Sequence, residues 1–257
     1  MMYSSAIYKD KNMDLEEASL HKLEVICQKL NLSDTDKVIE IGSGWGGFAI
    51  YAAKKYGCHV TTTTISKQQY QYVKAKISQL KLDKKITVLL KDYRDLEGSY
   101  DKLVSIEMIE AVGHHYYNSY FKVISQLLKA DGQALIQAIT IKDQRYKQAI
   151  KSIDFIQKYI FPGSCIPSLT AIQNSLTHST DLVINQVDDI GHHYAVTLQQ
   201  WRENFVMNLA KIHKLGFDDY FTRMWIFYLC YCEGGFLERS ISDLHIHITK
   251  PNHRNRI

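Results

Sequence analysis

No stretch of the 257-residue sequence approaches the roughly 18 uninterrupted apolar residues that a membrane-spanning helix needs, and the N-terminus has no apolar signal-peptide core. The five cysteines are scattered, and the spacing of Cys230 and Cys232 fits neither a zinc site nor a disulfide framework. Two neighbouring histidine pairs, at 114–115 and 192–193, have no third ligand at a zinc-like spacing. We therefore expect a protein of the reducing cytoplasm without a metal site.

A strong excess of one charge is also missing. The sequence has 31 Lys and Arg against 27 Asp and Glu, which gives a net charge of +4. This excess is too small to indicate a nucleic-acid partner, but it is compatible with visits to an anionic membrane surface. The composition, 46% hydrophobic and 23% charged, is ordinary for a soluble globular protein, and the length suits one large α/β domain.

The most informative motif is a group of four glycines, spaced Gly42-x-Gly44-x-x-Gly47, after a short β-prone stretch. Such a turn lets the main chain approach a ligand closely, and the following helix offers free N–H groups. The spacing also satisfies the dinucleotide fingerprint. However, Glu40 places a carboxylate at the strand end, and no Asp or Glu occurs in residues 41–82, where a dinucleotide ribose needs one. A cationic ligand is therefore favoured. The structural alternative is a turn that only packs helix on strand.

Strands alternate with helices along residues 37–141, which predicts a parallel sheet with helices on both faces. Ligands bind such sheets at the carboxyl ends of the strands, so one rim should hold Thr64 and residues 42–47, 92–95, 107–113 and 137–140. The expected strands are 37–41, 59–64, 85–91, 100–107 and 133–141, and the expected helices are 14–30, 47–56, 67–80 and 117–128.

The pattern changes after residue 141. Residues 142–180, which include Pro162 and Pro167, are expected to form an irregular cap, followed by strand 182–188, helices 197–215 and 218–237, and strand 244–250. We thus expect a single domain, 1–257, with an N-terminal lid and helix (1–33), a ligand-binding core (34–141), a cap and substrate region (142–196), and C-terminal helices with the last strand (197–257).

Several sequence blocks follow one another along almost the whole chain: Tyr3-Ser-Ser-Ala, Glu40-Ile-Gly-Ser-Gly-Trp-Gly-Gly, Thr64-Ile-Ser-Lys-Gln-Gln, Asp92-Tyr-Arg-Asp, Ser105-Ile-Glu-Met-Ile-Glu-Ala-Val-Gly, Gln137-Ala-Ile-Thr-Ile, Asp154-Phe-Ile-Gln-Lys-Tyr-Ile-Phe-Pro-Gly, His193-Tyr-Ala-Val-Thr-Leu and Tyr228-Leu-Cys-Tyr-Cys-Glu-Gly-Gly-Phe. Together they resemble the cyclopropane-fatty-acyl-phospholipid synthases and their mycolic-acid-modifying relatives. These are class I S-adenosylmethionine (SAM) methyltransferases. The resemblance implies an α/β, Rossmann-like fold with a mostly parallel seven-stranded sheet, helices on both faces and a cap insertion.

The resemblance also implies a cofactor site for SAM. Thr64 and Gln69 would replace the usual acidic ribose ligand, which accounts for the missing carboxylate. Glu40 at its strand end and Asp92 on the same rim complete the expected site. The positions that match SAM contacts in the family are Tyr3, Ser4, Gly42, Gly44, Thr64, Ile65 and Gln69.

Members of the family hold a bicarbonate ion as general base against the reacting carbon. The matched positions are Ser5, Glu110, Gln137, Ile139 and Tyr194. Ser5 stands where some members have Cys, and Gln137 where some have His. Both replacements can still hydrogen-bond an anion.

Two further residues have competing structural explanations. Cys232 matches the cysteine traditionally marked as the active-site residue, but it lies in an apolar helix, where a buried structural cysteine is also expected. Glu107 and Glu110, three residues apart, fit a helix-capping pair, and the family match assigns a functional role to Glu110.

The resulting hypothesis is an enzyme that uses SAM to convert the cis double bond of an unsaturated phospholipid acyl chain into a cyclopropane. It would work at the inner face of the membrane as a peripheral protein, and a homodimer is left open. An isolated alkene cannot be activated by deprotonation, so the protein must align the reactants, exclude water and stabilise the developing cation. The alternatives are a small-molecule N- or C-methyltransferase of the same fold, and a SAM-binding remnant without activity, which the short N-terminus favours.

Overall fold

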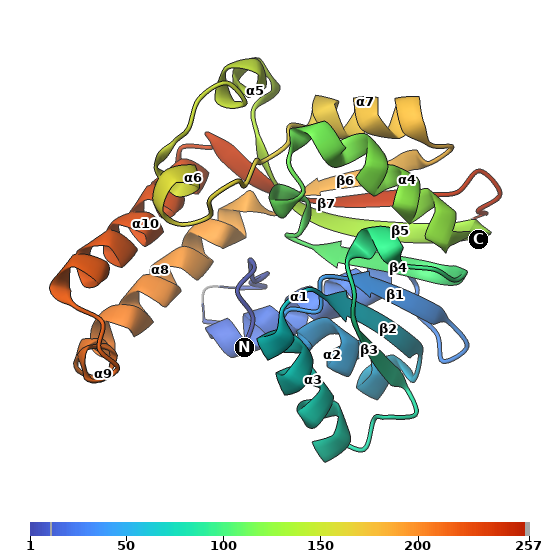
Figure 1. The fold of residues 1–257 in the computed structure, drawn as a ribbon, viewed down its shortest axis with the longest axis horizontal. Coiled ribbons are helices and arrows are strands. Elements are labelled where there is room, and N and C mark those ends of the chain that lie inside the picture. Colours follow the sequence, from blue (N-terminus) through green and yellow to red (C-terminus); the bar gives the residue numbers. More distant parts are fainter. Residues whose placement is uncertain (11, 255–257) are drawn as a thin grey trace.

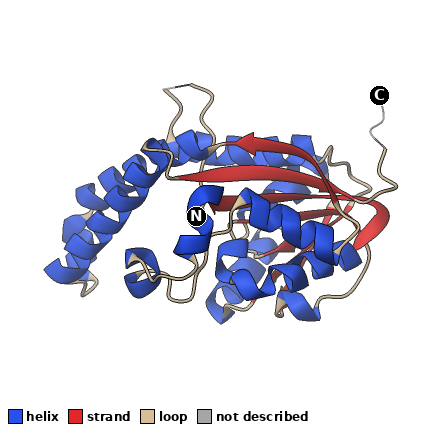
Figure 2. Ribbon diagram, turned by 90° about the horizontal axis from the view of Figure 1, so that it is seen from above, coloured by secondary structure: helices blue, strands red, loops and turns tan. Residues whose placement is uncertain are grey.

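The computed structural model describes residues 1–10 and 12–254, which form a seven-stranded sheet between helical layers (Figures 1 and 2). The strand order is β3-β2-β1-β4-β5-β7-β6. The first five strands in this order are parallel, and β7 runs antiparallel to both β5 and β6. The strands are β1 (Lys37–Ile41), β2 (His59–Thr64), β3 (Ile86–Leu90), β4 (Tyr100–Ile106), β5 (Leu128–Ile141), β6 (Val183–Asp189) and β7 (Ile241–Thr249).

Alternating residues of the strands build two cores, one on each face of the sheet. Val38 of β1 belongs to the core under α1 (Leu15–Lys29), α2 (Gly47–Tyr56) and α3 (Lys67–Gln79). Its neighbour Ile39 belongs to the core under α4 (Tyr117–Leu127) and α7 (Leu169–Ser179). This is the alternation that a strand buried on both faces requires. The expected α/β class with helices on both faces is confirmed.

The region expected to be an irregular cap is largely helical, which corrects the sequence prediction. It contains α5 (Asp143–Ala149), α6 (Phe155–Tyr159) and α7. Local capping explains two of these helices. Asp154 and Gln157 form a capping box at the start of α6, and the Ser168 side chain accepts a hydrogen bond from the Ala171 N–H at the start of α7. Such caps satisfy N–H groups that have no partner within the helix.

Two long helices form an arm that projects from one end of the sheet (Figure 1). The helix predicted from residue 197 begins six residues earlier and is interrupted at Asn208, which gives α8 (Gly191–Met207) and α9 (Leu209–Lys214). The following helix, α10 (Asp219–Leu237), packs along α8 through a third apolar cluster that includes Tyr194, Leu198, Leu229 and Phe236. Among the described helices, none is both long enough and apolar enough to span a membrane.

Candidate functional site

The glycine loop between β1 and α2 needs residues without side chains. Gly42, Gly44 and Gly46 have φ values of +94°, +48° and +84°, a region in which other residues are strained. The Gly42 and Ser43 N–H groups donate to the carbonyl of Thr63 in β2, at 3.2 and 2.8 Å, and fix the loop against the neighbouring strand. A Cβ atom on Gly42 would lie 3.2 Å from Cγ of Met108. The main chain of the loop is therefore fixed on the rim of the sheet.

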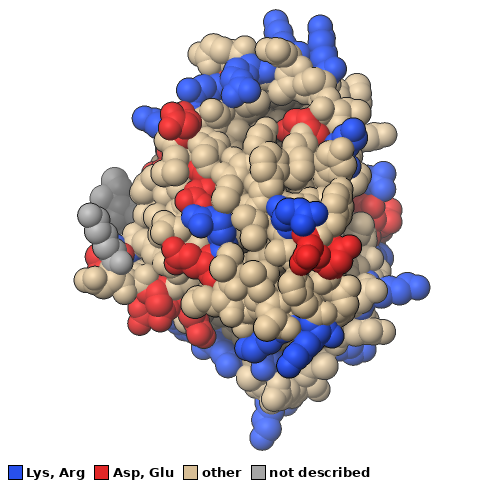
Figure 3. Space-filling model, turned by 90° about the vertical axis from the view of Figure 1, so that its left-hand side faces the viewer, with Lys and Arg blue, Asp and Glu red and all other residues tan. Residues whose placement is uncertain are grey.

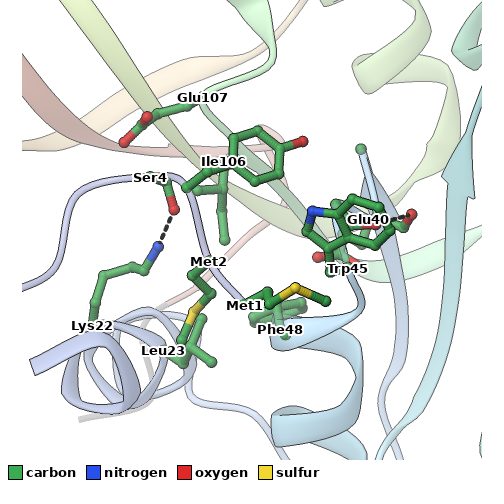
Figure 4. A pocket seen from close by; sticks show the side chains of 15 residues that line it. Met1, Met2, Ser4, Lys22, Leu23, Glu40, Trp45, Phe48, Ile106 and Glu107 are labelled. Carbon is green, nitrogen blue, oxygen red and sulfur yellow. Dashed lines mark hydrogen bonds between the residues drawn. The ribbon is translucent and has the colours of Figure 1, made fainter. Parts of the chain in front are cut away.

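A cavity lies against this loop (Figure 4). Its lining joins the N-terminal segment, α1 and the ends of β1 and β4, so residues distant in sequence meet there. On one side lie Trp45 and Phe48, and on the other Lys22 and Leu23. Tyr3, Ser4, Glu40, Gly42, Gly44 and Glu107 also line it. The cavity thus brings together several residues predicted to bind SAM.

Glu40 is a buried acid at the end of β1. Glu40 is only 2% exposed, and the Thr62 hydroxyl donates to its Oε2 at 2.6 Å. Burial raises the pKa of Glu40 to about 8, although the Thr62 hydrogen bond and the charge of Lys22 act in the opposite direction. Without a bound cation, Glu40 is therefore largely protonated at neutral pH. A ligand that carries positive charge or donates hydrogen bonds favours its ionised form.

We expect this burial to appear in the pH dependence of stability. The unfolded chain releases the Glu40 proton near pH 4.5, whereas the folded protein keeps it until about pH 8. The Glu40 contribution to the free energy of unfolding therefore falls as pH rises between these values, by at most about 1.4 kcal/mol per pH unit. Glu40→Gln removes this dependence and keeps an acceptor for Thr62. In urea denaturation from pH 5 to 8 without ligand, the variant should gain stability relative to wild type as pH rises. Parallel pH curves would contradict the shift.

The expected ribose site is connected by hydrogen bonds. The Thr64 hydroxyl donates to Oε1 of Gln69 at 2.8 Å, and Nε2 of Gln69 donates to the Tyr3 hydroxyl at 3.1 Å. Ile65, next to Thr64, is 76% exposed on the same rim. Asp92 follows β3 and is held by Arg94, whose side chain donates to both carboxylate oxygens, at 2.9 and 2.8 Å; this pairing lowers the pKa of Asp92.

A second group of polar residues surrounds Glu107, which follows β4 and also lines the cavity. The Ser5 N–H and the Gln137 Nε2 donate to its Oε1, at 2.8 and 2.7 Å. The Tyr194 hydroxyl donates to its Oε2 at 2.7 Å. Ser5, Gln137 and Tyr194 were predicted as bicarbonate ligands, and the structure brings them together. The prediction missed the carboxylate to which all three donate, because Glu107 was explained as part of a capping pair.

Gln137 is held in one orientation by partners on β7, which the sequence analysis also missed. Its Nε2 donates to Oδ2 of Asp243 at 2.7 Å, and its Oε1 lies 3.2 Å from Nε2 of His245. Burial lowers the pKa of His245 well below its usual value, so this ring is neutral. Lys29 lies 3.0 Å from the other ring nitrogen of His245 and 2.8 Å from Asp188, so His245 donates through Nε2. The alternation of polar and apolar residues in β7 was the one feature of the sequence that could have indicated these two partners.

Glu110 adds a second acid beside this group. Its Oε1 accepts a hydrogen bond from the Ile139 N–H at 2.6 Å, while its Oε2 is buried and has no hydrogen-bond partner among the described residues. Burial, followed by the charge of Glu107, raises the pKa of Glu110 to about 8. Glu110 therefore carries a proton at neutral pH. Glu110 and Ile139, both predicted as bicarbonate ligands, thus form a hydrogen bond with each other.

Cys232 lies in α10 and packs against the cluster that contains Tyr194. Burial raises the pKa of its thiol to about 12. A thiolate is therefore scarce at neutral pH. As for metals, no group of three or more potential His, Cys, Asp or Glu ligands occurs in residues 1–10 and 12–254.

A family model described as mycolic acid cyclopropane synthetase matches residues 1–246. The tuberculostearic acid methyltransferase of Mycobacterium tuberculosis is 37% identical over 92% of this chain, and the cyclopropane-fatty-acyl-phospholipid synthase of Escherichia coli is 38% identical over 94%. The chain spans 57% and 60% of the lengths of these two relatives.

Solved structures agree with this match. A mycolic acid cyclopropane synthase complexed with SAH and CTAB superposes with a TM-score of 0.89 at 26% identity, covering 97% of this chain and 90% of that one. A cyclopropane synthase of M. tuberculosis gives the same TM-score and coverage at 24% identity, which supports the fold. The fold is that of the class I SAM-dependent methyltransferases, and the chain belongs to the mycolic acid cyclopropane synthetase family.

Proposed function

We propose that this protein uses SAM to modify the cis double bond of an unsaturated fatty acyl chain carried by a phospholipid, and that the product is a cyclopropane. The observation that carries this proposal is the position of Glu107, which lines the cavity at the glycine loop and also accepts three hydrogen bonds from the buried polar group. A cofactor bound in this cavity would therefore lie beside the three hydrogen-bond donors. The two relatives described above, a fatty-acyl-phospholipid synthase and a tuberculostearic acid methyltransferase, support a lipid substrate.

The residues around the cavity fit SAM, which supplies an electrophilic methyl group on a sulfonium. Glu40 offers a carboxylate for hydrogen-bond donors or positive charge, and the glycine loop leaves the main chain accessible. Thr64, Gln69 and Tyr3 provide hydroxyl and amide groups for ribose. This chain's own contribution is to orient the two reactants and to keep water from the alkene.

The acyl chain needs an apolar path to the cavity, and the arm offers aromatic surface near it. Phe155 of α6 lies edge-on to Phe227 of α10, with ring centroids 4.8 Å apart, and Tyr194 stacks on Phe236 at 4.5 Å. Phe227 is 53% exposed. On the face that contains the arm's end, uncharged side chains lie between scattered charges of both signs (Figure 3). We propose this face for peripheral contact with a membrane.

Methyl addition to an alkene leaves a cation, and a proton must then leave the added carbon. We propose that an oxyanion held by Ser5, Gln137 and Tyr194 accepts this proton. For bicarbonate to be that oxyanion, it would have to displace the Glu107 carboxylate from these donors.

The test is a product assay with the purified chain, SAM and vesicles of phospholipid with cis-monounsaturated acyl chains. Each modified acyl chain should gain the mass of one CH₂ group, and proton NMR should show the upfield signals of a cyclopropane ring. Vesicles with saturated chains are the control and should give no product. Transfer to small amines with none to lipid would favour the N-methyltransferase alternative, and no transfer at all would favour a remnant that only binds SAM.

A second product is favoured by the relatives named as methyltransferases, including a sphingolipid C9-methyltransferase that is 32% identical over 90% of this chain. The same cation can lose its proton to give a methyl-derived alkene instead of a ring. This product has the same mass as the cyclopropane. Mild catalytic hydrogenation separates the two, because only the alkene takes up hydrogen readily.

We expect Cys232→Ser to keep a large part of the activity. Neither methyl transfer nor proton loss requires a thiolate, and burial disfavours one at this position. The main cost should be packing, on the order of 1 kcal/mol of unfolding free energy. Turnover is compared with wild type at matched folded fraction. Complete loss of turnover in a folded variant would mean that the sulfur takes part in the chemistry.

A further inference from the structure

We propose that the Glu107 carboxylate itself occupies the place expected for bicarbonate and is the base that accepts the proton. This inference rests on the proposed function for its chemistry, but its structural part can be tested separately. Three groups expected to hold the ion, the Ser5 N–H, the Gln137 amide and the Tyr194 hydroxyl, all donate to this one carboxylate. The Ile139 N–H, a fourth expected ligand, donates to Glu110. The protein thus uses its own carboxylates where an external anion was expected.

The hydrogen-bond count leaves Glu107 able to accept a proton. Oε1 receives two donors, from Ser5 and Gln137, and Oε2 receives one, from Tyr194. A carboxylate has about four lone-pair sites, so one site on Oε2 stays open. The residue lies at the edge of the cavity, on the same side as Ser4 and Lys22 (Figure 4). Its open site is therefore next to the space where SAM would bind.

The backbone at Glu107 is a second, independent observation. This residue has φ +48°, in the left-handed region that non-glycine residues seldom adopt. Its N–H donates to the Gln137 carbonyl at 2.8 Å, which fixes the conformation at the end of β4. Such strain persists where surrounding contacts enforce it, and it is concentrated at functional sites. A carboxylate kept at a position better suited to glycine indicates that the carboxylate has a role.

The surroundings assign the negative charge to Glu107 rather than to its acidic neighbours. The three partners of Glu107 donate to it, and a carboxylate is stabilised by such donors. Glu110 has a buried oxygen without a partner, as has Asp243. Burial and the charge of Glu107 raise the pKa of both these acids, so they hold their protons. Burial raises the pKa of Glu107 as well, but the charge of Lys22, which is 1% exposed, and the hydrogen bonds from Ser5 and Tyr194 act in the opposite direction and favour its ionised form.

The proposed reaction consists of methyl transfer followed by proton transfer. The methyl group forms a bond to one alkene carbon as its bond to sulfur breaks, and the other alkene carbon becomes cationic. Oε2 of Glu107 then accepts a proton from the added methyl group. The electron pair of that C–H bond forms the third bond of the ring. Glu107 ends as a neutral carboxylic acid and returns its proton to solvent after product leaves.

The decisive variant is Glu107→Gly. Glycine adopts φ +48° without strain, so the fold should be kept, and the loss of the carboxylate frees the three donors. In bicarbonate-free buffer we expect turnover to fall roughly 100-fold, within the range that a general base contributes. Added bicarbonate should restore much of this loss. Wild type should be indifferent to bicarbonate, and Glu107→Gln, which fills the space without a base, should be slow and not be rescued.

Binding of ¹³C-labelled bicarbonate, followed by NMR, separates this inference from the proposed function. Glu107→Gly should bind the ion, and wild type should not, whatever lipid product is formed. Equal binding by wild type and Glu107→Gly would overturn the inference. So would a wild-type enzyme that loses turnover when bicarbonate is removed. Absence of lipid modification by wild type, with the expected binding difference, would instead reject the proposed function and keep the placement of Glu107.

Discussion

Gly42→Val is expected to weaken SAM binding strongly. At φ +94° a branched side chain is strained, and its Cβ would lie 3.2 Å from Cγ of Met108. The loop must also present its main chain to the ligand, so the added side chain stands where the ligand would pack. We expect affinity for SAM, measured by titration calorimetry, to fall by at least roughly 100-fold, which corresponds to about 2.7 kcal/mol.

Gly216→Val is a matched control for this prediction. Gly216 has the same φ, +94°, but lies in the turn after α9, where an added Cβ meets nothing within 4 Å. It should therefore show the cost of backbone strain alone and bind SAM like wild type. If the two variants bound SAM equally well, the glycine loop would not be the cofactor site.

Tyr194→Phe should lower turnover by about 100-fold while SAM affinity stays nearly unchanged. The change deletes the hydroxyl that donates to Oε2 of Glu107 at 2.7 Å, and it keeps the ring that stacks on Phe236. Without this donor the carboxylate loses its orientation and part of its stabilisation. Initial rates at saturating SAM and lipid, together with calorimetry, separate the two effects.

Tyr117→Phe serves as the comparison for Tyr194→Phe. It deletes another hydroxyl that makes a 2.7 Å hydrogen bond, to the Cys165 carbonyl, in the core under α4 and α7. Both variants should lose some stability, but only Tyr194→Phe should lose turnover. An equal fall in SAM affinity and turnover for Tyr194→Phe would reassign Tyr194 to packing.

The sequence predicted the parallel half of the fold well, because its strands are short apolar or β-branched runs that end at strong turn signals. β1, α2 and β2 have the predicted bounds. Caps at Asp14, Ser66 and Asp218 start three further helices within one residue of the prediction. The secondary structure of the cap region was harder to predict, since its helices are short and one begins after two prolines.

The site could be predicted only in part, because its hydrogen bonds join residues that are far apart in sequence. The family resemblance identified Ser5, Gln137 and Tyr194, but their shared partner Glu107 is separated from them by 102, 30 and 87 residues. The position of Asp243 depends on β7 lying beside β5, which no local pattern specifies. Local chemistry therefore predicted the members of the site but not their pairing.

The place of β7 between β5 and β6 has a consequence for how the chain folds as it is made. β5 ends at Ile141, and β7 begins at Ile241, 100 residues later. At a synthesis rate of roughly 5–20 residues per second, on the order of 10 s pass between the synthesis of β5 and that of β7. During this time one edge of β5 lacks hydrogen-bond partners, which is a template for wrong pairing. The Gln137 side chain also lacks its hydrogen-bond partners Asp243 and His245 during this time. The nascent protein therefore depends on protection of this edge until its last strand has been added.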